Sequence, residues 1–139
     1  MSEVREITLS TDKVLAQITN KIGHVIFNNP ERHNAVSLEM WDAVEEALLA
    51  FSKDENVRVV ILSGAGGKSF VSGADISKFD SERGSKDAVD HYNARIKIVY
   101  NIIENFAKPT IAMINGYCIG GGLNLAACTD FRIVSDKSQ

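Results

Sequence analysis

Apolar and polar residues alternate along the first part of the chain, which is the pattern of β-strands with one buried face. Residues 4–9 and 13–19 show this alternation and predict two strands, and residues 22–27 predict a third. A polar pair at 11–12 predicts a turn between the first two strands, and Pro30 follows the end of the third. The chain therefore opens with three predicted strands joined by short connections.

The spacing of apolar residues changes after Ser37 to that of an amphipathic helix. Serine is a residue type that caps helices through its hydroxyl, so we expect Ser37 to cap this one. A longer helix is predicted over 86–106, and Pro109 cannot continue it. A shorter helix is predicted over 120–128. The residues expected to face inward are Leu38, Trp41, Val44, Leu48 and Phe51 in the first helix and Val89, Tyr92, Ile96, Val99, Ile103 and Phe106 in the second.

Short apolar segments alternate with these helices. Residues 57–62, 110–114 and 131–134 predict strands, and the run at 57–62 is typical of a strand covered on both faces. The polar residues 81–87 predict a surface loop. Strand–helix–strand order with apolar strands indicates an α/β domain. Because the chain stops directly after a strand-like segment, we expect residues 1–139 to form the front part of a longer fold.

Composition and charge narrow the functional class. With 45% apolar and 24% charged residues, the 139-residue chain has the composition of one globular domain. Its net charge of −3 argues against nucleic acid as the main partner, because phosphate-binding surfaces are basic. No apolar run approaches the roughly 18 residues of a membrane helix, and the N-terminus lacks the pattern of a signal peptide. Cys118 and Cys128 are expected to be buried, reduced thiols, and we expect a soluble, cytoplasmic protein with no membrane partner.

Two glycine-rich segments resemble cofactor motifs but do not satisfy them. Residues 63–69 contain a Gly-Lys-Ser sequence, yet Leu62 stands where a phosphate-binding P-loop needs its first glycine. Residues 120–125 begin with three glycines, but Leu125 stands where a dinucleotide fingerprint needs its third glycine. The sequence shows no His or Cys cluster. It therefore predicts neither a nicotinamide cofactor nor a bound metal.

Two glycine junctions remain as candidate sites, at 72–76 and 115–124. Three consecutive glycines that open a helix leave backbone N–H groups uncovered by side chains, at the positive end of the helix dipole. Such a turn can hold an anion. The same glycines can instead allow tight packing of the helix on a strand, and spacing alone leaves both interpretations open.

The second junction lies within residues 108–133 (KPTIAMINGYCIGGGLNLAACTDFRI), which closely resemble the signature of the enoyl-CoA hydratase/isomerase (crotonase) family. Three other segments resemble the family in the same order: residues 29–35 (NPERHNA), the strand at 57–62 with its glycine turn, and residues 70–76 (FVSGADI). Together the four segments cover nearly the whole chain. Members are longer, so the resemblance is to their N-terminal half. It implies a crotonase-like fold of repeated strand–strand–helix units.

The resemblance implies an enzyme that binds acyl-CoA thioesters and stabilises an enolate with two backbone N–H groups, which would be those of Ala74 and Gly121. Asn124 follows Gly121 by about one helical turn and is expected on the same cavity. Typical hydratases carry one of two catalytic glutamates there, and an amide cannot accept a proton from water. The family's other glutamate would fall after Gln139. Hydration is therefore in question, and isomerisation of a double bond by one base is the other implied reaction.

The resemblance also implies a CoA groove along the first junction, with CoA as part of the substrate and no separate cofactor. Arg32 would approach the CoA phosphates, although a solvated loop charge is the other interpretation, and Lys78 is a weaker candidate. Asp75 is expected mainly to hold the turn through hydrogen bonds. The implied CoA-binding residues are Arg32, Ala35, Ser72, Ala74, Asp75, Ile76 and Gly121.

Two functions remain open at this point. The first is hydration or isomerisation of an enoyl-CoA. The second is a catalytically silent acyl-CoA-binding or truncated interaction protein, which would keep the binding residues without a working carboxylate. Both predict an acyl-CoA partner. Family members form trimers or pairs of trimers largely through C-terminal helices, so a homotrimer or hexamer is expected only of a longer chain.

Overall fold

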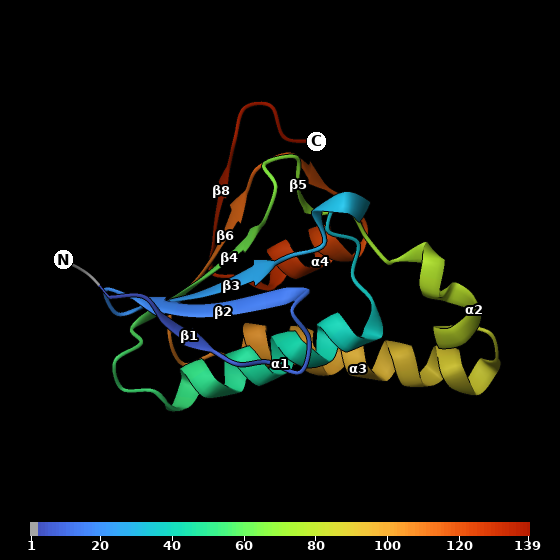
Figure 1. Cartoon of the computed structure of the whole chain (residues 1–139), viewed down its shortest axis with the longest axis horizontal. Helices are drawn as coiled ribbons and strands as arrows, with labels where there is room; N and C mark the ends of the chain where they lie inside the picture. Colours follow the sequence, from blue (N-terminus) through green and yellow to red (C-terminus); the bar gives the residue numbers. More distant parts are fainter. Residues whose placement is uncertain (1–2) are drawn as a thin grey trace.

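The computed structural model describes residues 3–139, which form a six-stranded sheet, a two-stranded sheet and helices packed against them (Figure 1). The strand order of the large sheet is β1-β2-β3-β4-β6-β8, and β5 pairs with β7 in the small sheet. None of the described helices is long and apolar enough to cross a membrane. The strands are β1 (Arg5–Ile7), β2 (Val14–Thr19), β3 (Ile22–Phe27), β4 (Val59–Gly64), β5 (Ser69–Val71), β6 (Thr110–Ile114), β7 (Tyr117–Cys118) and β8 (Phe131–Val134); the helices are α1 (Leu38–Lys53), α2 (Phe79–Glu82), α3 (Lys86–Glu104) and α4 (Gly121–Cys128), with short 3₁₀ turns at Pro30–Arg32 and Ile76–Lys78.

The pairing of the strands follows from their connections. β1, β2 and β3 pair antiparallel, as expected for neighbours joined by short turns, and β3, β4, β6 and β8 pair parallel. Parallel neighbours need crossover connections. The chain supplies these through α1, then α3, then α4, each placed between two successive strands of the parallel part. The α/β class predicted from the sequence is therefore confirmed.

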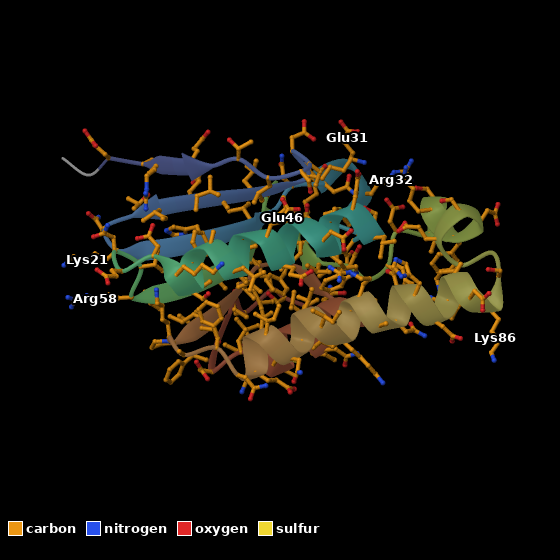
Figure 2. All side chains as sticks on the ribbon, turned by 90° about the horizontal axis from the view of Figure 1, so that it is seen from below. Lys21, Glu31, Arg32, Glu46, Arg58 and Lys86 are labelled. Atoms are coloured by element: carbon orange, nitrogen blue, oxygen red, sulfur yellow. The ribbon has the colours of Figure 1, made fainter. Side chains whose placement is uncertain are left out.

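α1 and α3 pack side by side on one face of the large sheet (Figure 1), and Figure 2 shows them in front of the strands when the molecule is seen from that side. Burial alternates along β2 and β3, so every second side chain enters the core beneath the helices. The predicted inward faces are largely confirmed. Trp41, Val44, Leu48, Phe51, Tyr92, Val99 and Ile103 are buried, whereas Leu38, Val89, Ile96 and Phe106 are half-buried.

The opposite face of the large sheet is only partly covered by the described residues. In β4, Val60 and Leu62 are buried, but Ile61, which points to the other side, is half-buried. At the edge strand β8, Phe131 is 62% exposed. The expectation that the strand at 57–62 is covered on both faces is wrong, because α1 and α3 both lie on the same side of the sheet.

The N-terminus of α1 is capped by a residue that lies far away in the sequence. Ser37 precedes the helix, but its hydroxyl makes no capping hydrogen bond and is buried without a partner among the described residues. Instead, the backbone N–H of Leu38 donates to the carboxylate of Glu82, the last residue of α2. A negative group at this end also interacts favourably with the helix dipole. The prediction that the Ser37 side chain caps the helix is therefore wrong.

Glu82 belongs to a segment for which the sequence predicted a loop. The structure instead has α2 up to Glu82 and α3 from Lys86 onward. The hydroxyl of Ser85 accepts the N–H of Ala88 at 3.1 Å and caps α3. Only residues 83–85 lie outside the two helices, so the loop predicted over 81–87 is too long at both ends. Local polarity does not reveal that the Glu82 carboxylate finds a backbone donor on another helix.

We expect Glu82→Gln to gain stability relative to wild type as the pH rises. Burial raises the pKa of Glu82 above the ordinary value of 4.5, and this outweighs the opposing effect of the Leu38 hydrogen bond. A carboxyl group with a raised pKa stabilises the native state below its unfolded-state pKa. That contribution is lost as the pH rises through the folded-state pKa. Thermal unfolding between pH 4 and pH 8 measures the difference.

The amide of the variant keeps an acceptor for the Leu38 N–H without carrying a charge. The two proteins should therefore have similar stability near pH 4, where the carboxyl group of wild type is protonated. A variant that is less stable than wild type at pH 8 would contradict the prediction. It would show that attraction between the carboxylate and the helix dipole exceeds the cost of burying the charge.

Candidate active site

A cavity of about 420 Å³ opens between α1, α3, α4 and the turn that follows β5. Ala74 in that turn, Gly121 at the start of α4 and Asn124 one turn later all line it. The structure thus brings together the three residues that the sequence predicted to be catalytic. The other lining residues are Trp41, Gly73, Arg83, Tyr92, Asn93, Ile96, Lys97 and Tyr100.

The backbone around Ala74 is held by a single parallel bridge to the segment before α1. The N–H of Val36 donates to the carbonyl of Gly73 (2.9 Å), and the N–H of Asp75 donates to the carbonyl of Val36 (3.1 Å). This pattern leaves out the N–H of Ala74, which donates no hydrogen bond within the described part of the chain. The buried Asp75 carboxylate accepts the N–H (3.0 Å) and the hydroxyl (2.6 Å) of Ser77, which is the turn-holding arrangement expected of it.

The three glycines at the start of α4 are needed for different reasons. Gly120 has φ +56°, a conformation that residues with side chains rarely adopt. A Cβ on Gly121 would meet the Tyr100 hydroxyl at 3.5 Å, an ordinary contact, so this position faces the cavity. A Cβ on Gly122 would lie 2.8 Å from the Cβ of Val71 and would overlap the Val71 carbonyl oxygen. The packing interpretation therefore applies to Gly122, where α4 lies against β5.

The N–H of Gly121, like that of Ala74, has no hydrogen-bond acceptor among residues 3–139. Gly121 is the first residue of α4, where the N–H groups lack partners within the helix and the helix dipole is positive. Two backbone donors without partners therefore lie on the wall of one cavity. Such a pair can stabilise negative charge that develops on an oxygen atom bound beside them.

No carboxylate is found among the residues that line this cavity in the described chain. Asn124 contributes an amide. Tyr100 donates its hydroxyl to the carbonyl of Gly121 at 3.2 Å, and burial raises the pKa of Tyr100 to about 12. Neither side chain can accept a proton at neutral pH, so both can position a bound group but cannot act as a general base.

The other residues predicted to bind CoA do not line the cavity. Arg32 extends into solvent from the turn after β3 (Figure 2), and its carbonyl accepts the hydroxyl of Ser72 at 3.5 Å. Ile76 is 75% exposed, whereas Ala35 is buried. These residues lie on the two segments that the bridge at Ala74 joins, so they lie beside the cavity.

Asn34 is a residue of this region that the sequence analysis did not single out. It is fully buried, and its amide nitrogen donates to the carbonyls of Ala65 and Ser69, both at 2.9 Å. Its amide oxygen accepts the N–H of Asn29 at 2.9 Å, and its φ of +57° lies in the left-handed region that Asn tolerates. Asn34 thus fixes the segment that carries Arg32 to the connection after β4. The family resemblance at residues 29–35 includes this position. It does not show, however, that the Asn34 amide bonds to the carbonyls of Ala65 and Ser69.

Several residues of α3 line the cavity, although the sequence predicted them only as core residues or gave them no role. The predicted inward stripe contains Tyr92 and Ile96 but not Asn93, Lys97 or Tyr100. Positions 93, 97 and 100 lie next to that stripe at helical spacing, which was a usable signal. Polar residues beside an apolar stripe usually face solvent, however, and only the packing of α3 against α4 turns this side toward a cavity.

Both cysteines are free thiols, as predicted, but they are half-buried rather than fully buried. Burial raises the pKa of Cys118 and raises that of Cys128 to about 11, so both are protonated at neutral pH. Among residues 3–139, no group of three or more His, Cys, Asp or Glu side chains is arranged to hold a metal ion.

The sequence of the chain is similar to that of known proteins. The family model described as enoyl-CoA hydratase/isomerase matches residues 17–139. A crotonyl-CoA hydratase from Syntrophomonas wolfei is 32% identical over 131 residues, which cover 94% of this chain and 50% of that protein. A mitochondrial Δ(3,5)-Δ(2,4)-dienoyl-CoA isomerase from Mus musculus is 36% identical over 118 residues, with coverage of 78% and 36%. The chain spans about half the length, or less, of these curated relatives.

Solved structures give the same result for the fold. The crystal structure of an enoyl-CoA hydratase/carnithine racemase from Magnetospirillum magneticum aligns with a TM-score of 0.88 at 37% identity and covers 94% of this chain and 49% of that one. A structure described as a crotonase from Legionella pneumophila aligns with a TM-score of 0.86 at 31% identity, with coverage of 93% and 50%. The crotonase-like fold predicted from the sequence is therefore confirmed.

Proposed function

The chain belongs to the enoyl-CoA hydratase/isomerase family, and from that premise we propose that it acts on acyl-CoA thioesters through an enolate held by the backbone N–H groups of Ala74 and Gly121. The observation that carries the proposal is that both donors lack partners within the described chain and line one cavity. Charge grows on the thioester oxygen as the enolate forms. Backbone N–H dipoles that are already fixed beside this oxygen stabilise the charge without having to reorganise.

The remaining CoA would lie along the two segments joined beside Ala74. Arg32 supplies an exposed cation there, and Ser72, Asp75 and Ile76 supply the turn along which the pantetheine would run. Backbone contacts suit this role because the turn carries small side chains at Gly73 and Ala74. A trimeric assembly of a longer chain and a cytoplasmic location remain predictions.

The polar groups of the cavity favour movement of a double bond over addition of water. Hydration requires a group that takes a proton from water, and Asn124 cannot do so. Isomerisation needs only one base, which removes and returns a single proton. No described residue of the cavity supplies it, so we assign this proton transfer to the glutamate that the family resemblance implies after Gln139, while Asn124 and Tyr100 orient the bound thioester. The second candidate function, a silent acyl-CoA-binding protein, is favoured by one specific observation: no carboxylate lines the cavity among the described residues.

We expect Asn124→Glu to gain hydratase activity. A carboxylate at this position would lie on the cavity wall beside Gly121 and could accept a proton from water, a contribution on the order of 10²–10⁴ in rate. The measurement is the loss of the conjugated-thioester absorbance when each protein meets a short 2-enoyl-CoA. Asn124→Gln is the matched control, because glutamine has the length of glutamate without its basicity.

The same absorbance separates the candidate functions. Its increase when wild type meets a 3-enoyl-CoA would support isomerisation, because the double bond then enters conjugation. Rapid loss of a 2-enoyl-CoA with wild type would contradict the preference for isomerisation. Binding of a saturated acyl-CoA without turnover of either substrate by wild type or Asn124→Glu would favour the silent binding protein.

A further inference from the structure

We propose that the cavity takes an acyl group that carries a carboxylate, and that Arg83 and Lys97 bind this carboxylate. The proposal rests on the proposed function, because it places the thioester of the same substrate at Ala74 and Gly121. It adds a substrate class, acyl-CoA esters of dicarboxylic acids, and two residues that select it.

The charge of the cavity wall carries the argument. Arg83 and Lys97 both line the cavity, together with the amide of Asn93, and no Asp or Glu lines it among the described residues. The chain as a whole is acidic, with a net charge of −3, and Glu82 directly precedes Arg83, yet neither Arg83 nor Lys97 forms an ion pair within the described chain. The wall therefore offers two cations to an anionic group, beside apolar side chains such as Trp41 and Ile96 that suit the methylene chain of an acyl group.

The guanidinium of Arg83 is held by aromatic rings rather than by a carboxylate. Its central carbon lies 5.2 Å from the ring centre of Phe79 and 5.4 Å from that of Tyr92. Stacking of this kind orients the guanidinium and leaves its N–H donors free. Within the described chain, Arg83 forms no ion pair, whereas Arg95 of α3 pairs with Asp42 and Glu45. The N–H donors of Arg83 are thus available to a ligand.

Lys97 is likewise free of acidic partners. Its neighbours on α3 at three and four residues are Asn93, Ala94, Tyr100 and Asn101, none of which is acidic. Its side chain is exposed and lines the cavity, and it forms no ion pair among the residues that the structure describes. Arg83 and Lys97 therefore offer two cationic groups to one ligand, approaching from the loop before α3 and from the middle of α3.

Arg83 lies away from the proposed backbone donors along α3, and Lys97 lies closer to them. Arg83 stacks on Tyr92, whereas Tyr100 contacts Gly121. Two turns of helix separate these tyrosines, a rise of roughly 12 Å. Lys97 lies between them in the sequence. A carboxylate at the far end of an acyl group can thus reach the cations while the thioester oxygen lies at Gly121.

The test is a comparison of binding by isothermal titration, with ligands that cannot be turned over. Glutaryl-CoA and pentanoyl-CoA have the same chain length and differ in a terminal carboxylate, and adipyl-CoA and hexanoyl-CoA repeat the comparison at greater length. Wild type should bind the carboxylated member of at least one pair about tenfold more tightly, the effect of one charge-assisted hydrogen bond. Arg83→Gln and Lys97→Gln should each remove most of that preference and leave the affinity for the uncharged member unchanged.

Matched controls are Arg58→Gln and Lys86→Gln, which remove the same charges from residues that extend into solvent (Figure 2) and do not line the cavity. Both should keep the preference. Equal affinity of wild type for both members of each pair would overturn the proposal and leave the proposed function intact. So would equal weakening of both members in Arg83→Gln and Lys97→Gln, which would assign the cations to the CoA phosphates that all four ligands share. Failure of wild type to bind any of the four would overturn the proposal together with the proposed function.

Discussion

An Ala74→Pro variant is expected to lose about 10²–10³ in kcat and to keep most of its affinity for a saturated acyl-CoA. Proline removes the N–H that would face the thioester oxygen, and the fold loses no backbone hydrogen bond because the Ala74 N–H donates none within the described chain. The loss should fall on kcat because the charge on this oxygen is largest in the transition state. Steady-state turnover of an enoyl-CoA and titration with butyryl-CoA measure the two quantities separately.

Ala74→Gly is the control, since it keeps the N–H and should keep turnover close to that of wild type. Gly121→Pro provides a second way to remove a donor. Its position is the first of α4, where proline is well tolerated, and a Cβ there makes only ordinary contacts. Wild-type turnover in both proline variants, with unfolding midpoints unchanged, would exclude these N–H groups from the reaction.

A Gly122→Ala variant is expected to lose about 3 kcal/mol of unfolding free energy, near the upper end of the usual cost of overpacking. The added methyl group would overlap the carbonyl oxygen of Val71 and lie 2.8 Å from its Cβ. Both are atoms of a buried strand that cannot rotate away, so α4 must move off β5. Urea unfolding followed by circular dichroism gives the free energy.

The neighbouring glycine serves as the control for this prediction. Gly121→Ala adds the same methyl group where it meets the Tyr100 hydroxyl at 3.5 Å, so its stability should stay within about 1 kcal/mol of wild type. Its turnover should nevertheless fall, because the methyl group narrows the cavity beside the proposed donor. Equal destabilisation by the two substitutions would show that α4 is not held against β5 as the structure indicates.

The strands of the large sheet and the three longer helices followed from the sequence because their causes are local, whereas β5 and β7 were not predicted. Alternation marks β2, helical spacing marks α1 and α3, and Pro109 prevents a helix from continuing into β6. The glycine junctions were equally visible, since few residue types can replace them at such turns. Four matching segments then indicated the family, and with it the pair Ala74 and Gly121 on one cavity.

The partners of individual side chains could not be predicted in this way. Periodicity states which side of an element is apolar, but it does not state which distant element will face that side. Glu82 rather than Ser37 caps α1 because the end of α2 lies beside the start of that helix. No residue near Ser37 in the sequence indicates this contact. The same holds for Asn34, whose acceptors lie more than thirty residues away.

The sequence by itself determined the order along the chain of the six strands of the large sheet and of the three longer helices, the α/β class, the family and the residues at the two glycine junctions. Only the tertiary structure decided that Gly122 serves packing while Gly121 faces a cavity, and that Arg83 and Lys97 line the same cavity. The physical reason is the range of the forces involved. Backbone conformation and hydrophobic spacing act between near neighbours in the chain, whereas a cavity and its charge arise where helices and turns far apart in the sequence come together.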